Sequence, residues 1–335
     1  MNNAPASCGA EGREVRRSNS PARTNSPLGC SARRGTAKQV PSGKLAADLS
    51  ALGSSTAEVA QPCVPAIELR EVSFSYGKEP FIGGLSAMFS HGAVTSIVGP
   101  NGCGKSTMVK LVDGLLRPQA GEVRVGGVPT LSLKAKARAR RVAVLAQASR
   151  PPAMTVEALV ACGRYPYQAH QGKLSREDRE HVERALELAG IARFRTQELR
   201  RLSGGERQRA FIAMTLAQDT DLIVLDEPTT YLDISACHDL MALVRDLNRR
   251  EGKTVAMVIH DLDLALRYSD YLVVMQKGRV VDAGPTDEVL ASGAVGDAFS
   301  MDICPHDRPR FAERGEDFEG RAETERGYVL YPRRR

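Results

Sequence analysis

The chain has 335 residues, 42% of them hydrophobic, which is enough to bury a substantial core in one large domain or two small ones. Of its net charge of +6, residues 1–65 carry +4 and residues 303–335 carry +1, so the middle of the chain is nearly neutral and does not present the basic face of a nucleic-acid-binding protein. No run approaches the ~18 consecutive apolar residues of a membrane helix, so we expect a soluble protein that reaches a membrane only through a partner.

The two ends of the chain differ in composition from the part between them. Residues 1–64 are rich in Ser, Ala, Arg, Gly and Pro without apolar periodicity, so we expect a disordered extension. Residues 306–335 are polar and charged, which predicts a flexible tail. Between them, residues 65–305 form the expected α/β domain. Its first strand is expected at residues 67–72, where apolar and polar side chains alternate, and a β-rich layer continues to about residue 127.

A glycine-rich loop follows the next expected strand, at residues 94–98. It fits the pattern G-x-x-x-x-G-K-[ST] at every fixed position, and a helix is expected from residue 106 to residue 116. In such a loop the backbone N–H groups face phosphates, Lys105 reaches the β- and γ-phosphates, and the hydroxyl of Ser106 ligates Mg²⁺. The sequence therefore predicts an ATP site with Mg²⁺ as cofactor. The expected contacts in the loop are Gly99, Pro100, Asn101, Gly102, Cys103, Gly104, Lys105, Ser106 and Thr107.

The seven cysteines form no C-x-x-C pair and no metal-like cluster in the sequence. Reduced thiols in a cytosolic protein are therefore expected. Cys103 lies inside the glycine-rich loop, where it is either a small space-filling residue or a reachable thiol.

A helical segment is expected over about residues 150–215, after a strand at residues 142–146 that ends before Gln147. One face of this segment shows the helical spacing i, i+3, i+4, i+7 and should pack on the core. Its members are Val182, Ala185, Leu186 and Ala189.

The segment Ser203-Gly204-Gly205-Glu206 has the form of a capping box, so a helix should begin there and continue through residues 207–216. Two glycines in the first turn leave backbone N–H groups uncovered, and such a helix N-terminus is an anion site. The alternative is an ordinary capped helix. The tetrapeptide alone does not decide between them, but the neighbouring motifs favour the anion site.

An acidic pair follows the apolar run at residues 222–225, which is typical of a central parallel strand. Asp226 and Glu227 stand at its carboxyl end, where open α/β sheets place their ligands. We expect Asp226 to hold Mg²⁺, directly or through water, and Glu227 to orient and activate the attacking water. A solvated acidic loop is the alternative, but it fits poorly because Pro228 follows at once. Further strands are expected at residues 254–259, 271–275 and 279–282.

With these three motifs in this order, residues 66–305 resemble the ATP-binding subunit of ABC transporters. The resemblance implies a P-loop ATPase fold with an antiparallel β layer, a RecA-like parallel-sheet core and a helical subdomain. It implies ATP hydrolysis by a homodimer paired head to tail, with each ATP between the phosphate loop of one copy and residues 203–206 of the other. It also implies a membrane permease dimer as partner, an extracytoplasmic substrate-binding protein acting indirectly, and a peripheral place on the cytoplasmic face of the membrane.

The same resemblance assigns further residues. Tyr76, which stands 29 residues before Lys105, matches the aromatic residue that stacks on adenine, the alternative being a core residue at a strand end. Gln147 matches the glutamine that senses Mg²⁺ and contacts the membrane partner. His260 matches the switch histidine at the γ-phosphate, and Asp233 matches the loop that crosses the dimer interface. The implied catalytic set is Glu227, His260, Gln147 and Asp233, and the implied Mg²⁺ set is Ser106, Gln147 and Asp226.

Four stretches narrow the resemblance to importers of iron–siderophore, haem and cobalamin type. They are Thr-Val-Glu-Ala-Leu-Val at residues 155–160, Gly-Arg-Tyr-Pro-Tyr at 163–167, Thr-Thr-Tyr-Leu-Asp-Ile at 229–234 and His-Asp-Leu-Asp-Leu-Ala at 260–265. We therefore expect a ferric siderophore as cargo, with haem or cobalamin as alternatives. The permease is expected to dock near Gln147 and an exposed Arg164–Tyr167 segment, unless the tyrosines simply pack the helical subdomain.

Two rival functions remain within the family. One is a non-transport ATPase acting on nucleic acid, which would carry a long coiled-coil insertion or a second ATPase module. Lys105 and Ser203 are only 98 residues apart, without heptads between them, which argues against it. The other is the ATPase half of an exporter, against which the stretch at residues 163–167 argues.

Overall fold

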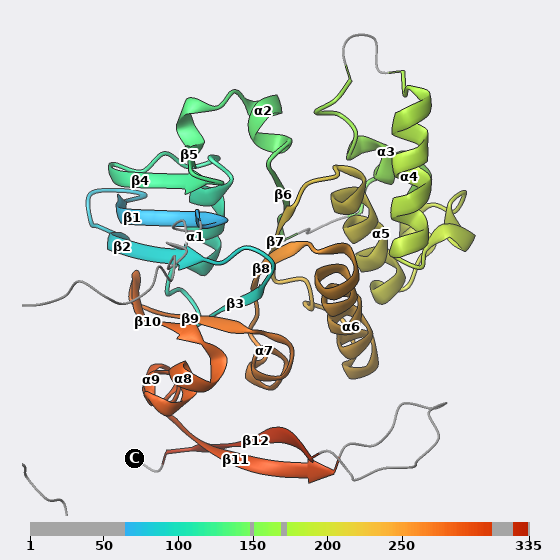
Figure 1. Ribbon diagram of the computed structural model, residues 1–335. Helices are drawn as coiled ribbons and strands as arrows, with labels where there is room; N and C mark the ends of the chain where they lie inside the picture. The colour runs from blue at the N-terminus through green and yellow to red at the C-terminus, as the bar shows by residue number, and fades with distance from the viewer. Residues whose placement is uncertain (1–63, 148–150, 169–172, 310–323, 334–335) are drawn as a thin grey trace, which may run out of the picture. The chain divides into compact units, whose positions relative to one another are not determined.

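The computed structural model describes residues 64–147, 151–168, 173–309 and 324–333 (Figure 1). The disordered extension expected at residues 1–64 therefore lies outside the described residues, apart from Val64, and stays a prediction. The remaining elements form two larger sheets, a set of helices and a two-stranded hairpin.

The smaller of the two larger sheets is antiparallel and runs in the order β2-β1-β4-β5. Buried and more exposed residues alternate along much of β1, because one face of the sheet packs on the core while the other meets solvent. This explains the alternation of apolar and polar residues in the sequence. This sheet is the antiparallel β layer that the sequence predicts. Its strands are β1 (Ile67–Phe74), β2 (Ile82–Phe89), β4 (Ala120–Val125) and β5 (Val128–Pro129).

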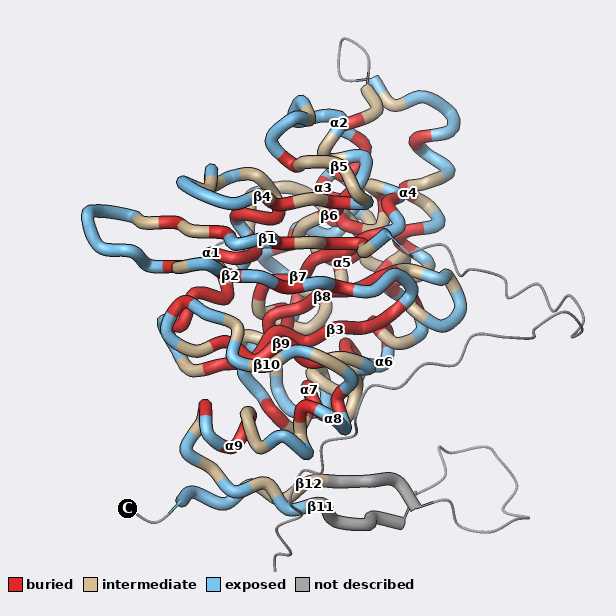
Figure 2. The backbone as a smooth tube through the Cα atoms, turned by 60° about the vertical axis from the view of Figure 1, so that its left-hand side comes forward, coloured by how far each residue is buried: buried red, intermediate tan, exposed pale blue. Residues whose placement is uncertain are grey.

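The second sheet runs in the order β10-β9-β3-β8-β7-β6 and is parallel except at β10, which pairs antiparallel with β9. Strands β3, β7 and β8 are buried along their whole length (Figure 2), as expected for apolar runs covered on both faces. The strands are β3 (Val94–Val98), β6 (Val142–Leu145), β7 (Leu222–Asp226), β8 (Thr254–Val258), β9 (Tyr271–Gln276) and β10 (Arg279–Pro285).

Nine α-helices lie in the described part of the chain. The first one ends at Val112, earlier than the expected residue 116, because Gly114 adopts a positive φ of 70° that stops the helix. The helices are α1 (Lys105–Val112), α2 (Ala135–Ala139), α3 (Val156–Cys162), α4 (Arg176–Leu188), α5 (Gly204–Ala217), α6 (Ile234–Glu251), α7 (Leu262–Tyr268), α8 (Thr286–Ala291) and α9 (Ala294–Phe299).

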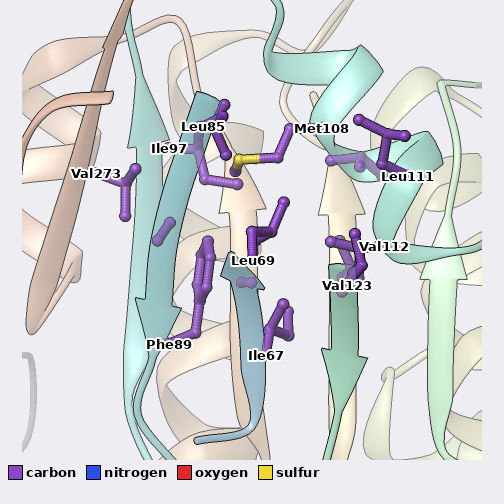
Figure 3. Packing of buried hydrophobic residues seen from close by; sticks show 14 of the residues in the cluster. Ile67, Leu69, Leu85, Phe89, Ile97, Met108, Leu111, Val112, Val123 and Val273 are labelled. Carbon is purple, nitrogen blue, oxygen red and sulfur yellow. The ribbon is translucent and has the colours of Figure 1, made fainter. Parts of the chain in front are cut away.

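The antiparallel sheet and α1 share one hydrophobic cluster (Figure 3). Ile67 and Leu69 of β1 pack there with Met108 and Leu111 of α1, all nearly inaccessible to solvent. Because α1 begins at the end of the glycine-rich loop, this packing fixes the helix that carries the loop.

The helical subdomain has a core of its own, built by α3, α4 and α5. The four residues singled out by their helical spacing are all buried in it, which confirms that prediction: Val182, Ala185, Leu186 and Ala189.

The described C-terminal residues, 301–309 and 324–333, differ from the flexible tail expected at residues 306–335, and the rest of that tail lies outside the described residues. Strands β11 (Met301–Pro309) and β12 (Thr324–Pro332) form an antiparallel hairpin. Tyr328 and Leu330, two residues apart on β12, pack against the core of the second sheet. The side chain of Arg333 also bonds to Asp297 and Asp302, at 2.7 and 2.8 Å. These contacts stabilise strands where net polarity alone suggests a solvated tail.

A buried ion pair lies within the helical subdomain. Arg164 Nε donates to Asp178 Oδ1 at 2.8 Å, and the two side chains are 3% and 8% exposed. Asp178 also closes the capping box of α4 with Ser175. Burial raises the pKa of Asp178, but the hydrogen bonds from Arg164 and Ser175 outweigh burial and hold that pKa below its ordinary value of 3.8.

Replacing Asp178 by asparagine tests this ion pair. Loss of one partner leaves a buried charge uncompensated, so we expect the free energy of unfolding to fall by about 3–5 kcal/mol near neutral pH. Because the folded-state pKa of Asp178 is depressed, its contribution is complete above the unfolded value of 3.8 and is lost as the pH falls through the folded pKa. Urea unfolding of wild type and Asp178→Asn should therefore show a gap that narrows only in acid.

Glu180→Gln is the matched control on the same helix. Glu180 is 65% exposed and pairs with Arg176 at 3.0 Å, so its loss should change stability by at most about 1 kcal/mol. A gap between wild type and Asp178→Asn that stays constant down to the acid end of the titration would contradict the assignment.

Candidate functional site

The glycine-rich loop folds tightly against β9. Gly99 has a φ of 154°, and a Cβ built on it would lie 2.1 Å from the carbonyl oxygen of Met275, so only glycine fits. The same Cβ would lie 2.8 Å from Cys103 Sγ. The Cys103 side chain is only 4% exposed, which identifies it as a space-filling residue of the loop.

Lys105 begins α1 and is buried under the loop that precedes it. Its Nζ donates to the carbonyl oxygens of Gly99 at 2.7 Å and Pro100 at 3.2 Å. The lysine thus stabilises the curled loop from the inside. Its ammonium group lies at the start of α1, where it is available to negatively charged groups that enter the loop.

Asp226 joins the end of β7 to the start of α1. Its Oδ1 accepts a hydrogen bond from Ser106 Oγ at 3.1 Å. Burial raises the pKa of Asp226 and the nearby charge of Glu227 adds to this, while the bond from Ser106 opposes it. A carboxylate and a hydroxyl side by side are oxygen ligands of the kind that Mg²⁺ prefers. These two residues therefore fit a magnesium ion whose remaining ligands would include phosphate oxygens.

Glu227 is contacted by side chains from two neighbouring strand ends and from its own loop. Gln147 Nε2, beyond β6, donates to its Oε2 at 2.7 Å, and His260 Nε2, beyond β8, lies 2.5 Å from its Oε1. Thr230 Oγ1 adds a longer contact of 3.3 Å to Oε2. The carboxylate, only 14% exposed, is therefore fixed in position, at the edge where parallel sheets place their ligands.

A cavity of about 400 Å³ brings the loop together with two of these residues. The fold therefore places the predicted loop residues, Glu227 and His260 around one cavity. Its lining residues are Phe81, Asn101, Gly102, Gly104, Lys105, Ser106, Thr107, Glu227 and His260.

Tyr76 lies beside this loop and is 61% exposed, so it is not the core residue that the alternative interpretation suggested. Its hydroxyl is 3.0 Å from Thr107 Oγ1, and its ring meets Phe74 and Phe81 edge-on, at centroid distances of 4.8 and 5.5 Å. A ring that is 61% exposed beside the loop has surface available to a flat ligand.

Ser203 caps α5 as the sequence predicts. The backbone N–H of Glu206 donates to Ser203 Oγ at 3.3 Å, and Glu206 Oε2 accepts from the backbone N–H of Ser203 at 3.0 Å. Ser203 donates two bonds to the Glu206 carboxylate, first from its backbone N–H and then from its Oγ at 2.9 Å, and these hold the pKa of Glu206 below its ordinary value.

The start of α5 does not share the cavity of the glycine-rich loop in the part of the chain that is described. Ser203, Gly205 and Glu206 line a separate cavity of about 440 Å³, together with Arg193. Gly204 borders a third cavity, next to Gln147 and Glu227. Within one chain, Ser203, Gly205 and Glu206 therefore line a different cavity from the phosphate loop, while Gly204 lies near Glu227.

Asp233 caps α6, because its Oδ1 accepts from the backbone N–H of Ala236 at 2.8 Å. The segment before α6 runs against the start of α5, where a Cβ on Gly204 would lie 3.2 Å from the carbonyl oxygen of Tyr231. Tyr231 and Ile234 beside it are 86% and 81% exposed. The sequence gives only one signal that Ile234 is an interface residue, which is its place next to Asp233.

Arg164 is not the exposed docking residue expected from the sequence. It is 3% exposed, paired with Asp178, and covered by the ring of Tyr167 at 4.0 Å from the ring centroid. Tyr167 therefore packs within the helical subdomain, as the alternative interpretation held. Tyr165 remains on the surface at 65% exposure. The residue types at 163–167 could not predict that Arg164 is buried, because its partner, the buried carboxylate of Asp178, lies outside that stretch.

In the described ranges, no cluster of three or more His, Cys, Asp or Glu side chains could hold a metal ion on its own. Nor does any helix within those ranges have the length and apolarity to cross a membrane.

The chain matches one family model and several known proteins. The family model described as "ABC transporter" matches residues 82–230. The petrobactin import ATP-binding protein FpuD of Bacillus anthracis is 42% identical over 247 residues, covering 73% of this chain and 90% of that protein. The ferric enterobactin transport ATP-binding protein FepC of Escherichia coli is 40% identical over 240 residues, or 71% and 89% of the two chains.

Solved structures agree on the fold. A metal-chelate type ABC transporter in an inward-facing conformation matches with a TM-score of 0.67 and 24% identity, covering 79% of this chain and 97% of that one. A dimeric ATP-binding cassette bound to ADP and Pi matches with a TM-score of 0.57 and 29% identity, covering 66% and 98%.

Proposed function

This chain belongs to the ABC transporter family, and we propose that it powers the import of a ferric siderophore through a membrane permease. As a member of the family it binds and hydrolyses ATP. The observation that carries the assignment of the hydrolytic site is the convergence of Gln147 and His260 on Glu227 at the phosphate-loop cavity. The named cargoes of relatives about 40% identical, petrobactin and ferric enterobactin, support the cargo.

For hydrolysis, we assign the loop at residues 99–107 and the Lys105 ammonium to the phosphates, and the exposed face of Tyr76 to the adenine ring. Ser106 and Asp226 would hold Mg²⁺, which neutralises phosphate charge when bound. Glu227 takes a proton from the attacking water while the oxygen of that water bonds to the γ-phosphorus and ADP leaves. Gln147 and His260 hold that carboxylate in place, because both contact its oxygens.

We assign residues 203–206 to the ATP of a second copy. Ser203, Gly205 and Glu206 line a different cavity from the phosphate loop, which supports this, since a helix N-terminus outside the loop's own cavity can meet another nucleotide. The dimeric relative bound to ADP and Pi supports it too. Asp233, next to the exposed Tyr231 and Ile234, then lies at the contact between the copies.

ATP-binding subunits of ABC importers work as dimers with membrane permeases, and this protein is a membrane-associated subunit of that kind. We place it on the cytoplasmic face, with an extracytoplasmic binding protein supplying the cargo and no nucleic-acid partner. The permease docks near Gln147 and the exposed Tyr165. The ATPase domain spans residues 65–305, with its helical subdomain at about 150–215.

Glu227→Gln tests the catalytic assignment, because it keeps the side-chain shape and removes the base. Steady-state ATPase should fall roughly 10²-fold or more, as for the loss of a general base. ATP binding should survive, and an ATP-bound dimer should accumulate on gel filtration. Glu187→Gln, an exposed glutamate of α4, is the control and should hydrolyse ATP normally. Near-normal turnover by Glu227→Gln would remove Glu227 from the mechanism.

Ser203→Arg tests the composite site, because the arginine blocks the start of α5 without touching the phosphate loop. The monomer should still bind ATP, while ATPase activity and ATP-driven dimerisation should be lost. Thr155→Arg removes the comparable cap of α3, where Thr155 Oγ1 accepts from Ala158, and should leave dimerisation intact. Loss of nucleotide binding by the Ser203→Arg monomer would show that the two motifs serve one nucleotide within a chain.

The cargo is tested by uptake of radiolabelled ferric siderophores into iron-starved cells that lack this protein. Wild type should restore uptake, and Tyr165→Ala should reduce it while the isolated subunit keeps its basal ATPase. Tyr331→Ala, 54% exposed on β12, is the matched surface control. If the deletion strain takes up every ferric siderophore normally but fails to take up haem or cobalamin, the cargo assignment is wrong.

A further inference from the structure

The turn after α3 packs directly on the carboxyl end of α5. A Cβ on Gly163 would lie 2.2 Å from the carbonyl oxygen of Met214, so the backbone passes where only glycine fits. The next residue, Arg164, reaches over the last turn of α5, and its Nη1 donates to the carbonyl oxygen of Ala217 at 2.9 Å. That carbonyl is one of the four at a helix end without an intrahelical partner, and a cation is favoured there.

The Arg164 side chain is held by two further contacts. Its Nε bonds to Asp178 at 2.8 Å, and the ring of Tyr167 covers the guanidinium at 4.0 Å. The planar guanidinium donates here from two different nitrogens in fixed directions, whereas a lysine has a single donor nitrogen whose protons rotate. The arginine therefore links the start of α4, through Asp178, with the end of α5, through Ala217.

A second tether holds the same end of α5 to the central sheet. Gln218, which caps α5, donates from Nε2 to the carbonyl oxygens of Ala139 at 2.5 Å and Val142 at 3.0 Å. Val142 begins β6, and β6 ends just before Gln147. The carboxyl end of α5 is thus bound both to the helical subdomain and to the strand that leads to the catalytic glutamate's partner.

We propose that Arg164 is a positioning residue for ATP hydrolysis: by holding the carboxyl end of α5, it aims residues 203–206 at the ATP of the second copy. This rests on the composite site proposed above. Helix α5 has 14 residues and is about 20 Å long at 1.5 Å per residue. A tilt of about 3° at the tethered end therefore moves the capped end by about 1 Å, and a misplacement of that size can reduce the rate by up to ~10²-fold.

The rival explanation is that the ion pair only stabilises the subdomain. The two differ when both charges are removed together, because replacing a whole buried ion pair by neutral residues is often harmless to stability. The test is the double variant Arg164→Met with Asp178→Asn, in which the asparagine oxygen can still cap α4. Thermal unfolding, ATP binding by the monomer, ATP-driven dimerisation and kcat are measured on the full chain.

We expect the double variant to regain most of the stability lost in Asp178→Asn and to bind ATP as wild type does, but to show kcat lowered by about tenfold or more. Arg164→Lys keeps the charge beside Asp178 without reaching both partners, so kcat should fall while the protein stays folded and binds ATP. Wild-type kcat in either folded variant would overturn the proposal, and Arg164→Lys decides the matter if the double variant does not fold.

Arg195→Met is the matched control within the same subdomain. Arg195 bonds to Glu157 of α3 and Glu183 of α4, at 2.8 and 2.9 Å, and is 37% exposed. It ties the subdomain together without an ion pair to α5, so its loss should leave kcat unchanged. Ser203→Arg separates the two proposals: if that variant stays active, the composite site fails, whereas an inactive Ser203→Arg beside active Arg164 variants overturns the positioning role alone.

Discussion

Parallel pairing in register is the constraint on which the site depends. Strands β3, β6, β7 and β8 end at the same level of the sheet, so the residues just beyond them emerge at one edge. Gln147, Glu227 and His260 meet there, next to the loop that follows β3. A one-residue slip would turn these side chains away from one another. The pairs that set the level are Leu145 with Leu225, Asp226 with Val258, and Ile97 with Val258.

Glu227 is held in a conformation that glutamate does not prefer. Its φ of +54° lies in the left-handed region, which costs an ordinary residue of order 1 kcal/mol or more. The surroundings offset this, because its backbone N–H donates to the carbonyl oxygen of Val258 at 3.2 Å and its carboxylate is bonded to Gln147. The fold thus fixes the position of the carboxylate, which is what the general-base role proposed for Glu227 requires.

Features that depend on neighbouring residues in the sequence could be predicted, and features that depend on distant partners could not. The capping box at Ser203 is complete within four residues, and the apolar strands needed no knowledge of their neighbours. The burial of Arg164 depends on Asp178 and on Ala217, which is 53 residues away, so local residue types suggested a surface. The hairpin β11–β12 could not be predicted for the same reason, because its apolar residues are stabilised by a core formed from distant parts of the chain.

The exposed pair Tyr231 and Ile234 has a practical consequence for anyone who purifies this subunit. At 86% and 81% exposure, they present apolar surface to water next to the start of α5. Apolar patches of this kind favour self-association. Solubility of the isolated chain should therefore depend on whether a second copy covers these residues. Because ATP is expected to drive dimerisation, adding nucleotide to the buffer should reduce aggregation.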